Sequence, residues 1–218
     1  MMVTGSREDY LICIHKLTQG GGVAKTNDIA QFMKVSPASV TEMMRRLAEE
    51  NLVDYEKYRG VRLTRAGQRH AKQIRRKHRL MERFLVNILD TDAETAHEEA
   101  CKLEHVLSDS AAQKLCRIIG EPEECTGCDD TCDGICVNHS LTQDTVASMN
   151  EGDAAVISHL RCENAEKIRK LISMGFVPGR RIVLENDLPF KGPIVLRIGD
   201  SRVALDRDYA DLIFVDRD

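Results

Sequence analysis

The sequence lacks any apolar stretch long enough to cross a membrane. Hydrophobic residues make up 42% of its 218 residues, yet no run approaches the roughly 20 consecutive apolar residues that a spanning helix needs. Residues 1–9 also lack the apolar core of a secretory signal peptide. We therefore expect a cytoplasmic protein with no membrane partner. Its length suits two or three small domains.

The sequence also lacks the overall positive charge that favours nucleic-acid binding, because its formal net charge is −4. The charges are unevenly distributed, however. Residues 1–80 hold 16 Lys and Arg against 8 Asp and Glu, a net of +8, whereas residues 81–218 carry a net charge of −12. A basic segment on an acidic protein favours a polyanionic partner such as DNA, although a solvated helical face explains the same charges.

The first third of the chain has the element order of a winged helix-turn-helix. Residues 8–17 and 26–33 are predicted helices, and the Ser-Pro pair at 36–37 is a strong start for a third one. The predicted buried face of that helix follows the spacing i, i+3, i+4, i+7 and consists of Val40, Met43, Met44 and Leu47. Two short strands, 52–58 and 61–64, complete the pattern.

The middle of the chain is predicted to be helical. A long helix begins after Thr64, and further helices are expected from Ala93 to Leu107 and from Ser110 to Ile119. The apolar stripes between about Leu80 and Ile119 are too extensive for so short a segment to bury alone. This favours a homodimer, as does a winged helix that reads a palindromic site.

The last part of the chain has the pattern of a small β-barrel. From about Leu141, short apolar runs alternate with turn signals such as Pro178-Gly179 and Gly199-Asp200. One amphipathic helix, Ala165 to Met174, interrupts them. The predicted fold class is therefore mainly α, with a small all-β domain at the C-terminus.

Potential metal ligands gather in the helical middle segment. At about 100° per residue, one helix face after Asp92 would carry four ligand-type side chains at roughly 0°, 40°, −20° and 80°; these are His97, Cys101, Glu104 and His105. His78 and Glu82 form a second same-face pair on the preceding helix. A single His/Glu pair of this spacing is usually a surface hydrogen bond, so the four-residue group is the more specific signal.

These segments together resemble the diphtheria toxin repressor family of metal-dependent regulators. The similar segments are SREDYLICIHKL (6–17), the winged-helix segment 23–67, KHRLMERFL (77–85) and AHEEACKLEHVLS (96–108). The C-terminal segments resemble the FeoA type of SH3-like barrel; these are KIRKLISMGFVPGRRI (167–182), GPIVLRIGDSRVAL (192–205) and ADLIFV (210–215). The resemblance implies a winged-helix domain at 1–72, a metal-binding and dimerisation domain at 73–120, a linker at 121–140 and the SH3-like domain at 141–218.

The resemblance implies two metal sites. The primary one would use Asp9, Cys101, Glu104 and His105. The ancillary one would use His78, Glu82 and His97. The sequence combines features of two branches of the family. Asp9 matches the manganese-type members, which carry Asp at this position, whereas Cys101 matches the iron-type members, which carry Cys. A thiolate is softer than the oxygen ligands that Mn²⁺ favours, so we expect Fe²⁺, with Mn²⁺ as the alternative.

The expected function is metal-dependent repression by a dimer that binds double-stranded operator DNA. Residues expected near base edges are Ser36, Ala38, Ser39, Thr41 and Glu42. Residues expected at phosphates are Arg45, Arg46, Lys57, Arg59 and Arg62. One alternative is a winged-helix regulator that senses an organic ligand. The other, an enzyme with a Cys/His pair, lacks an oxyanion site in the sequence, so we expect no enzymatic activity.

The linker has a feature that the resemblance does not explain. Its four cysteines have the spacing C-x2-C-x3-C-x3-C and are Cys125, Cys128, Cys132 and Cys136. In a reducing compartment such a cluster favours a bound Zn²⁺ or an iron–sulfur cluster over disulfides, with free thiols as the alternative.

Overall fold

The computed structural model describes residues 7–19, 21–119, 144–161, 164–190 and 192–217. These residues form two compact units. The first comprises the described residues within 1–79 and 98–106, and the second those within 80–97 and 107–218. The four cysteines of the linker lie outside the described residues, so the site predicted there stays a prediction. No helix in the described part of the chain is both long and apolar enough to cross a membrane.

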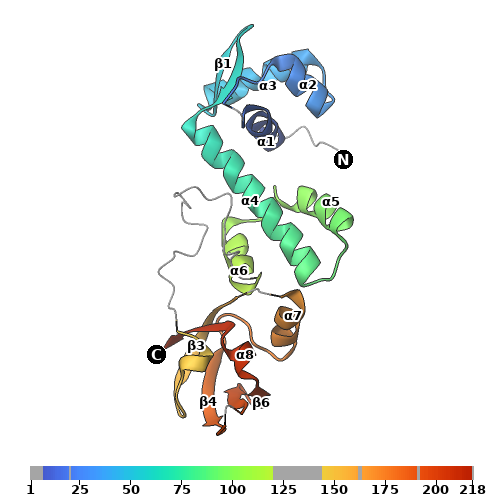
Figure 1. The fold of residues 1–218 in the computed structure, drawn as a ribbon. Helices are drawn as coiled ribbons and strands as arrows, with labels where there is room; N and C mark the ends of the chain where they lie inside the picture. Colours follow the sequence, from blue (N-terminus) through green and yellow to red (C-terminus); the bar gives the residue numbers. More distant parts are fainter. Residues whose placement is uncertain (1–6, 20, 120–143, 162–163, 191, 218) are drawn as a thin grey trace. The chain divides into compact units, whose positions relative to one another are not determined.

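The first unit contains the predicted winged helix-turn-helix (Figure 1). Its elements are α1 (Arg7–Thr18), α2 (Thr26–Met33), α3 (Pro37–Glu49), β1 (Val53–Glu56) and β2 (Gly60–Leu63). The three helices and the hairpin enclose one apolar core, whose largest fully buried side chains include Leu11, Ile14, Ile29, Met44 and Leu47. The predicted element order is therefore confirmed.

Helix α3 begins where the Ser-Pro pair predicts. The side chain of Ser36 accepts a hydrogen bond from the backbone N–H of Ser39 at 3.1 Å, which satisfies one of the free donors at the helix start. Val40, Met44 and Leu47 are fully buried as expected. Met43 is only half-buried, because it lies at the edge of this helix face and packs against the core from the side.

The hairpin that forms the wing depends on a glycine. Strands β1 and β2 pair antiparallel, from Val53 opposite Leu63 to Glu56 opposite Gly60. Gly60 has a φ of 113°, and a Cβ at this position would lie 2.6 Å from the carbonyl oxygen of Ala24. The close approach lets Ala24 pair with Val61 of β2 through two backbone hydrogen bonds, which attaches the wing to the helices.

The two helices that follow the wing agree with their predicted bounds to different degrees. Helix α4 (Arg65–Asn87) starts directly after Thr64, whose hydroxyl accepts from the N–H of Gly67 at 3.1 Å, so the predicted cap is confirmed. Helix α5 (Ala93–Leu103) is shorter than predicted. The chain leaves the helix after Leu103 in a turn closed by a hydrogen bond from Val106 N–H to the Leu103 carbonyl. Two candidate ligands, Glu104 and His105, therefore lie in this turn instead of on the helix.

The second unit contains the end of α4, helix α6 (Asp109–Ile119) and the C-terminal β domain (Figure 1). The β domain is a five-stranded antiparallel sheet with strand order β6-β5-β4-β3-β7. Its strands are β3 (Ala154–Leu160), β4 (Arg181–Asp187), β5 (Ile194–Ile198), β6 (Ser201–Leu205) and β7 (Ile213–Arg217). Its helical elements are η1 (Val146–Ser148), α7 (Ala165–Ser173) and α8 (Arg207–Ala210). The predicted all-β domain is confirmed.

Within the second unit the β domain contacts the end of α4. Ile88 packs against the core of the sheet. The Arg169 guanidinium on α7 donates to Asp90 Oδ1 at 2.8 Å and to the carbonyl oxygen of Asn87 at 3.3 Å. These contacts anchor the segment that joins α4 to α5.

Candidate metal centre

The first turn of α1 presents two adjacent carboxylates. The apolar face of the helix, which includes the buried Tyr10, Leu11 and Ile14, packs into the core of the first unit and fixes the rotation of the helix. Glu8 and Asp9 lie just before this apolar stretch, where the positive end of the helix dipole favours acidic side chains.

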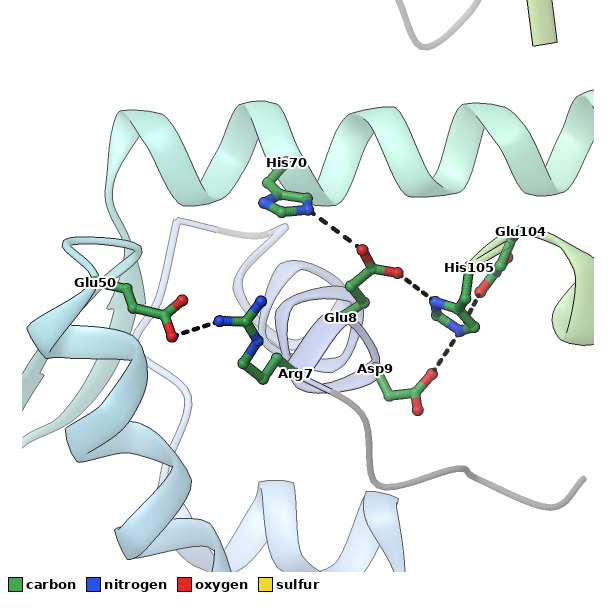
Figure 2. A network of polar contacts seen from close by, with 7 residues as sticks. All are labelled: Arg7, Glu8, Asp9, Glu50, His70, Glu104 and His105. Atoms are coloured by element: carbon green, nitrogen blue, oxygen red, sulfur yellow. Dashed lines mark hydrogen bonds and ion pairs between the residues drawn. The ribbon is translucent and has the colours of Figure 1, made fainter. Parts of the chain in front are cut away.

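Asp9 meets the turn that follows α5 (Figure 2). Its Oδ1 lies 3.1 Å from Nε2 of His105, and the same nitrogen lies 3.3 Å from Oε1 of Glu104. One potential ligand atom from each of these three residues lies within 4.8 Å of the other two. The structure thus brings together three of the four residues predicted for the primary site. Asp9 lies about 95 positions before the other two in the sequence.

The fourth predicted residue, Cys101, lies beside a different histidine. Its sulfur and a ring nitrogen of His78 are within 4.8 Å of each other. His78 also connects to the first group, because its Nδ1 lies 2.7 Å from Oε2 of Glu104. In the first unit, Glu104 therefore joins a group with Asp9 and His105 to a group with His78 and Cys101.

The charge and burial of Glu104 suit a cation. Among the described residues only Glu104 and Ser158 are polar and buried, and the Glu104 side chain is 7% exposed. A buried carboxylate is stable only when it is paired or bound to a metal. Burial lowers the pKa of His105, but its hydrogen bond to Glu8 and the charges of Asp9 and Glu104 outweigh that effect and raise the pKa. This carboxylate and imidazole set fits a divalent transition metal.

The residues predicted for the ancillary site are placed on their helices as expected. His78 and Glu82 are one turn apart on α4, and His97 lies one turn before Cys101 on α5. In the second unit, Nδ1 of His97 is 2.6 Å from Oε1 of Glu82. The His97 side chain is 50% exposed, so this pair is open to solvent.

Sequence reasoning missed two polar residues of the network. Glu8 Oε2 lies 2.5 Å from Nδ1 of His105, and Glu8 Oε1 lies 3.5 Å from Nε2 of His70 on α4 (Figure 2). The only signal for Glu8 in the sequence is its position next to Asp9, and an acidic residue at a helix start has an ordinary explanation in the helix dipole.

Comparisons with known proteins identify the family of each part of the chain. Residues 2–61 match the iron-dependent repressor N-terminal DNA-binding domain, residues 64–133 its metal-binding and dimerisation domain, and residues 145–217 the FeoA domain. An uncharacterised HTH-type transcriptional regulator of Methanocaldococcus jannaschii is 41% identical over 50% of this chain and 89% of its own length. The chain belongs to the iron-dependent repressor family. This is a family of metal-dependent transcriptional regulators.

Two further similar proteins are a transcriptional regulator and a protein whose structure holds a metal ion. The HTH-type transcriptional regulator MntR of Bacillus subtilis is 36% identical over 56% of this chain and 86% of its own length. The structure of ScaR with bound Cd²⁺ is 30% identical, with a TM-score of 0.52 over 98% of this chain and 100% of the other.

The DNA-binding face expected for such a repressor is exposed. Ser36, Ala38, Ser39, Glu42, Arg45 and Arg46 on α3, and Lys57, Arg59 and Arg62 on the wing, are all exposed, whereas Thr41 is half-buried. Two of the arginines have acidic partners: Arg46 pairs with Glu42 at 2.5 Å, and Arg59 with Glu56 at 3.0 Å. Tyr58, which sequence reasoning did not single out, is 94% exposed at the tip of the wing.

Proposed function

We propose that this chain is a ferrous-iron-dependent repressor that binds operator DNA as a homodimer. The observation that carries the choice of metal is the position of Cys101 beside His78. Glu104, which contacts His78, also belongs to the group with Asp9 and His105. A thiolate and imidazoles are softer ligands than carboxylates, and they favour Fe²⁺ and later metals over Mn²⁺.

The primary site is assigned to Asp9, Cys101, Glu104 and His105. His78 is eligible for the same site, because it lies beside both Cys101 and Glu104. A bound divalent cation would supply positive charge to this group of carboxylates. The ancillary set of His78, Glu82 and His97 remains part of the proposal.

The position of Asp9 suggests how metal binding would favour DNA binding. Asp9 belongs to α1, which packs in the same core as the proposed recognition helix α3. Next to it, Arg7 forms an ion pair at 2.5 Å with Glu50, the residue that caps the end of α3 (Figure 2). Ligands drawn from both α1 and the turn after α5 bind metal tightly only when these elements are held together, so binding selects one arrangement of the DNA-binding helices.

Manganese is the second candidate effector. The carboxylates of Glu8, Asp9 and Glu104 surround His105, and oxygen ligands suit Mn²⁺. Similar proteins carry the names manganese regulator SloR and MntR. The two candidates differ in what they require of Cys101, since only the iron proposal gives its thiolate a selective role.

The test measures operator binding as a function of the concentration of free Fe²⁺ or free Mn²⁺, in the absence of oxygen. It compares wild type with Cys101→Glu. We expect wild type to respond at lower Fe²⁺ than Mn²⁺, and the variant to shift its preference towards Mn²⁺. Cys116→Ala, which removes a thiol on α6, is the matched control and leaves the preference unchanged. A wild type that prefers Mn²⁺, or a preference that Cys101→Glu leaves unmoved, would refute the iron assignment.

The dimer is proposed from the helical middle segment. Leu80, Phe84 and Leu115 belong to a small apolar cluster on α4 and α6, and residues 64–133 match a metal-binding and dimerisation domain. Two winged helices related by two-fold symmetry suit a palindromic operator. Sedimentation at micromolar concentration tests this proposal, and a monomer in the presence of metal and operator DNA would contradict it.

A further inference from the structure

We propose that Glu8 is a positioning residue that holds the His105 ring with one defined nitrogen towards the metal ligands. The inference rests on the proposed metal centre and adds a residue that neither the sequence pattern nor the family resemblance points to. It concerns which nitrogen of His105 faces the cation and what fixes that choice.

The two nitrogens of His105 have different surroundings (Figure 2). Nε2 faces the carboxylates of Asp9 at 3.1 Å and Glu104 at 3.3 Å. Nδ1 faces Glu8, with Oε2 at 2.5 Å. An ionised carboxylate only accepts hydrogen bonds, so Nδ1 carries the proton and donates it to Glu8. Nε2 is then the nitrogen available to a cation between Asp9 and Glu104.

Helix geometry explains why adjacent carboxylates serve opposite sides of one ring. Successive side chains of an α-helix diverge by about 100°. Glu8 and Asp9 therefore extend in different directions, and each contacts a different nitrogen of His105 (Figure 2). Asp9 belongs to the group of potential ligands around Nε2, whereas Glu8 lies outside that group.

Glu8 is itself held from two sides. Its Oε2 accepts from His105 in the turn after α5, and its Oε1 lies 3.5 Å from Nε2 of His70 on α4. Its side chain is 32% exposed, and it sits on a helix whose next buried residues, Tyr10 and Leu11, are fixed in the core. A carboxylate that accepts from the second nitrogen of a ligand histidine fixes its tautomer and ring orientation and increases its basicity.

The experiment follows the side chain of His105 in the full-length protein. Long-range ¹H–¹⁵N correlation spectra, with His105 assigned by His105→Gln, resolve its two nitrogens during a Zn²⁺ titration. In wild type we expect the metal to shift Nε2 while Nδ1 stays protonated. Glu8→Ala should raise the Zn²⁺ concentration for half-saturation at His105 by about 10–100-fold, as for other residues that orient metal ligands.

Two variants separate positioning from other roles of Glu8. Glu8→Gln keeps the size of the side chain and an oxygen that accepts from Nδ1–H, so it should recover most of the lost affinity. Glu99→Gln removes the charge of an exposed carboxylate that pairs with Lys102 on α5 and should leave the His105 response unchanged. A Glu8→Gln variant as weak as Glu8→Ala would overturn positioning in favour of a requirement for negative charge.

The outcomes also separate this inference from the proposed function. A wild type in which His105 does not respond to Zn²⁺ refutes the metal centre itself. A wild type that responds normally, together with an unaffected Glu8→Ala or a metal bound at Nδ1, refutes only the role of Glu8.

Discussion

His78 and Glu104 are in close contact away from solvent: Nδ1 of His78 lies 2.7 Å from Oε2 of Glu104, and their side chains are 15% and 7% exposed. The other oxygen of Glu104 lies 3.3 Å from His105. One buried carboxylate is thus shared between histidines from α4 and from the turn after α5. This makes Glu104 the residue on which the proposed centre depends most.

Removing the charge of Glu104 should abolish the response to metal. Glu104→Gln preserves the shape of the side chain but leaves a neutral amide where the site needs a carboxylate, and we expect metal affinity to fall by about 100-fold, equivalent to about 2.7 kcal/mol. His105→Ala should act in the same direction. Anaerobic calorimetry and metal-dependent operator binding measure the effect. Glu99→Gln, at a surface pair with Lys102 on α5, is the control, and full metal activation of Glu104→Gln would show that the site is misplaced.

The wing should contribute a phosphate contact through Arg59. Its side chain is 81% exposed and pairs with Glu56 at the surface. Arg59→Ala should weaken operator binding and reduce the slope of log affinity against log salt concentration by about 1, because one fewer phosphate is neutralised. Binding measured from low to high salt checks this. Arg202→Ala on the β domain is the control, and an unchanged slope for Arg59→Ala would exclude the contact.

Stability should depend on pH through His15. Burial lowers the pKa of His15, and the charges of Arg75, Lys72 and Arg79 on α4 lower it further. The unfolded chain then binds a proton more readily than the folded one, so stability is retained above about pH 6.5 and lost as the pH falls towards the folded pKa. Urea unfolding of metal-free protein at several pH values measures this effect. As the pH is lowered, the free energy of unfolding should fall less for His15→Gln than for wild type. Equal losses would argue against this linkage.

Gly67 should not tolerate a side chain. A Cβ there would lie 2.0 Å from the carbonyl oxygen of Leu52, so helix α4 can pack against that backbone only with glycine at this position. We expect Gly67→Ala to destabilise the protein by about 1–3 kcal/mol or more, as overpacking does. Gly22→Ala, where a Cβ meets nothing within 4 Å, is the control. Similar unfolding midpoints for the two variants would contradict the argument.

Helix periodicity predicted the ligand types well but not their grouping. Four ligands can share one helix face only if the helix runs through His105, whereas α5 ends at Leu103. The resemblance groups Cys101 with Asp9, and the structure adds that the sulfur of Cys101 lies beside His78. Spacing along one helix predicts which side chains share a face. It does not predict which residues of other elements that face contacts.

The sequence by itself determined the local elements and the fold class. Ser36 and Thr64 cap the helices that they were expected to cap, and the apolar runs of the C-terminal part became the strands of one sheet, because caps, turns and periodicity act within a few residues. Only the tertiary structure decided that Glu8 contacts His105, 97 positions away. That contact depends on how α1 lies beside the turn after α5, and contacts between elements so far apart in the chain are encoded by no local pattern.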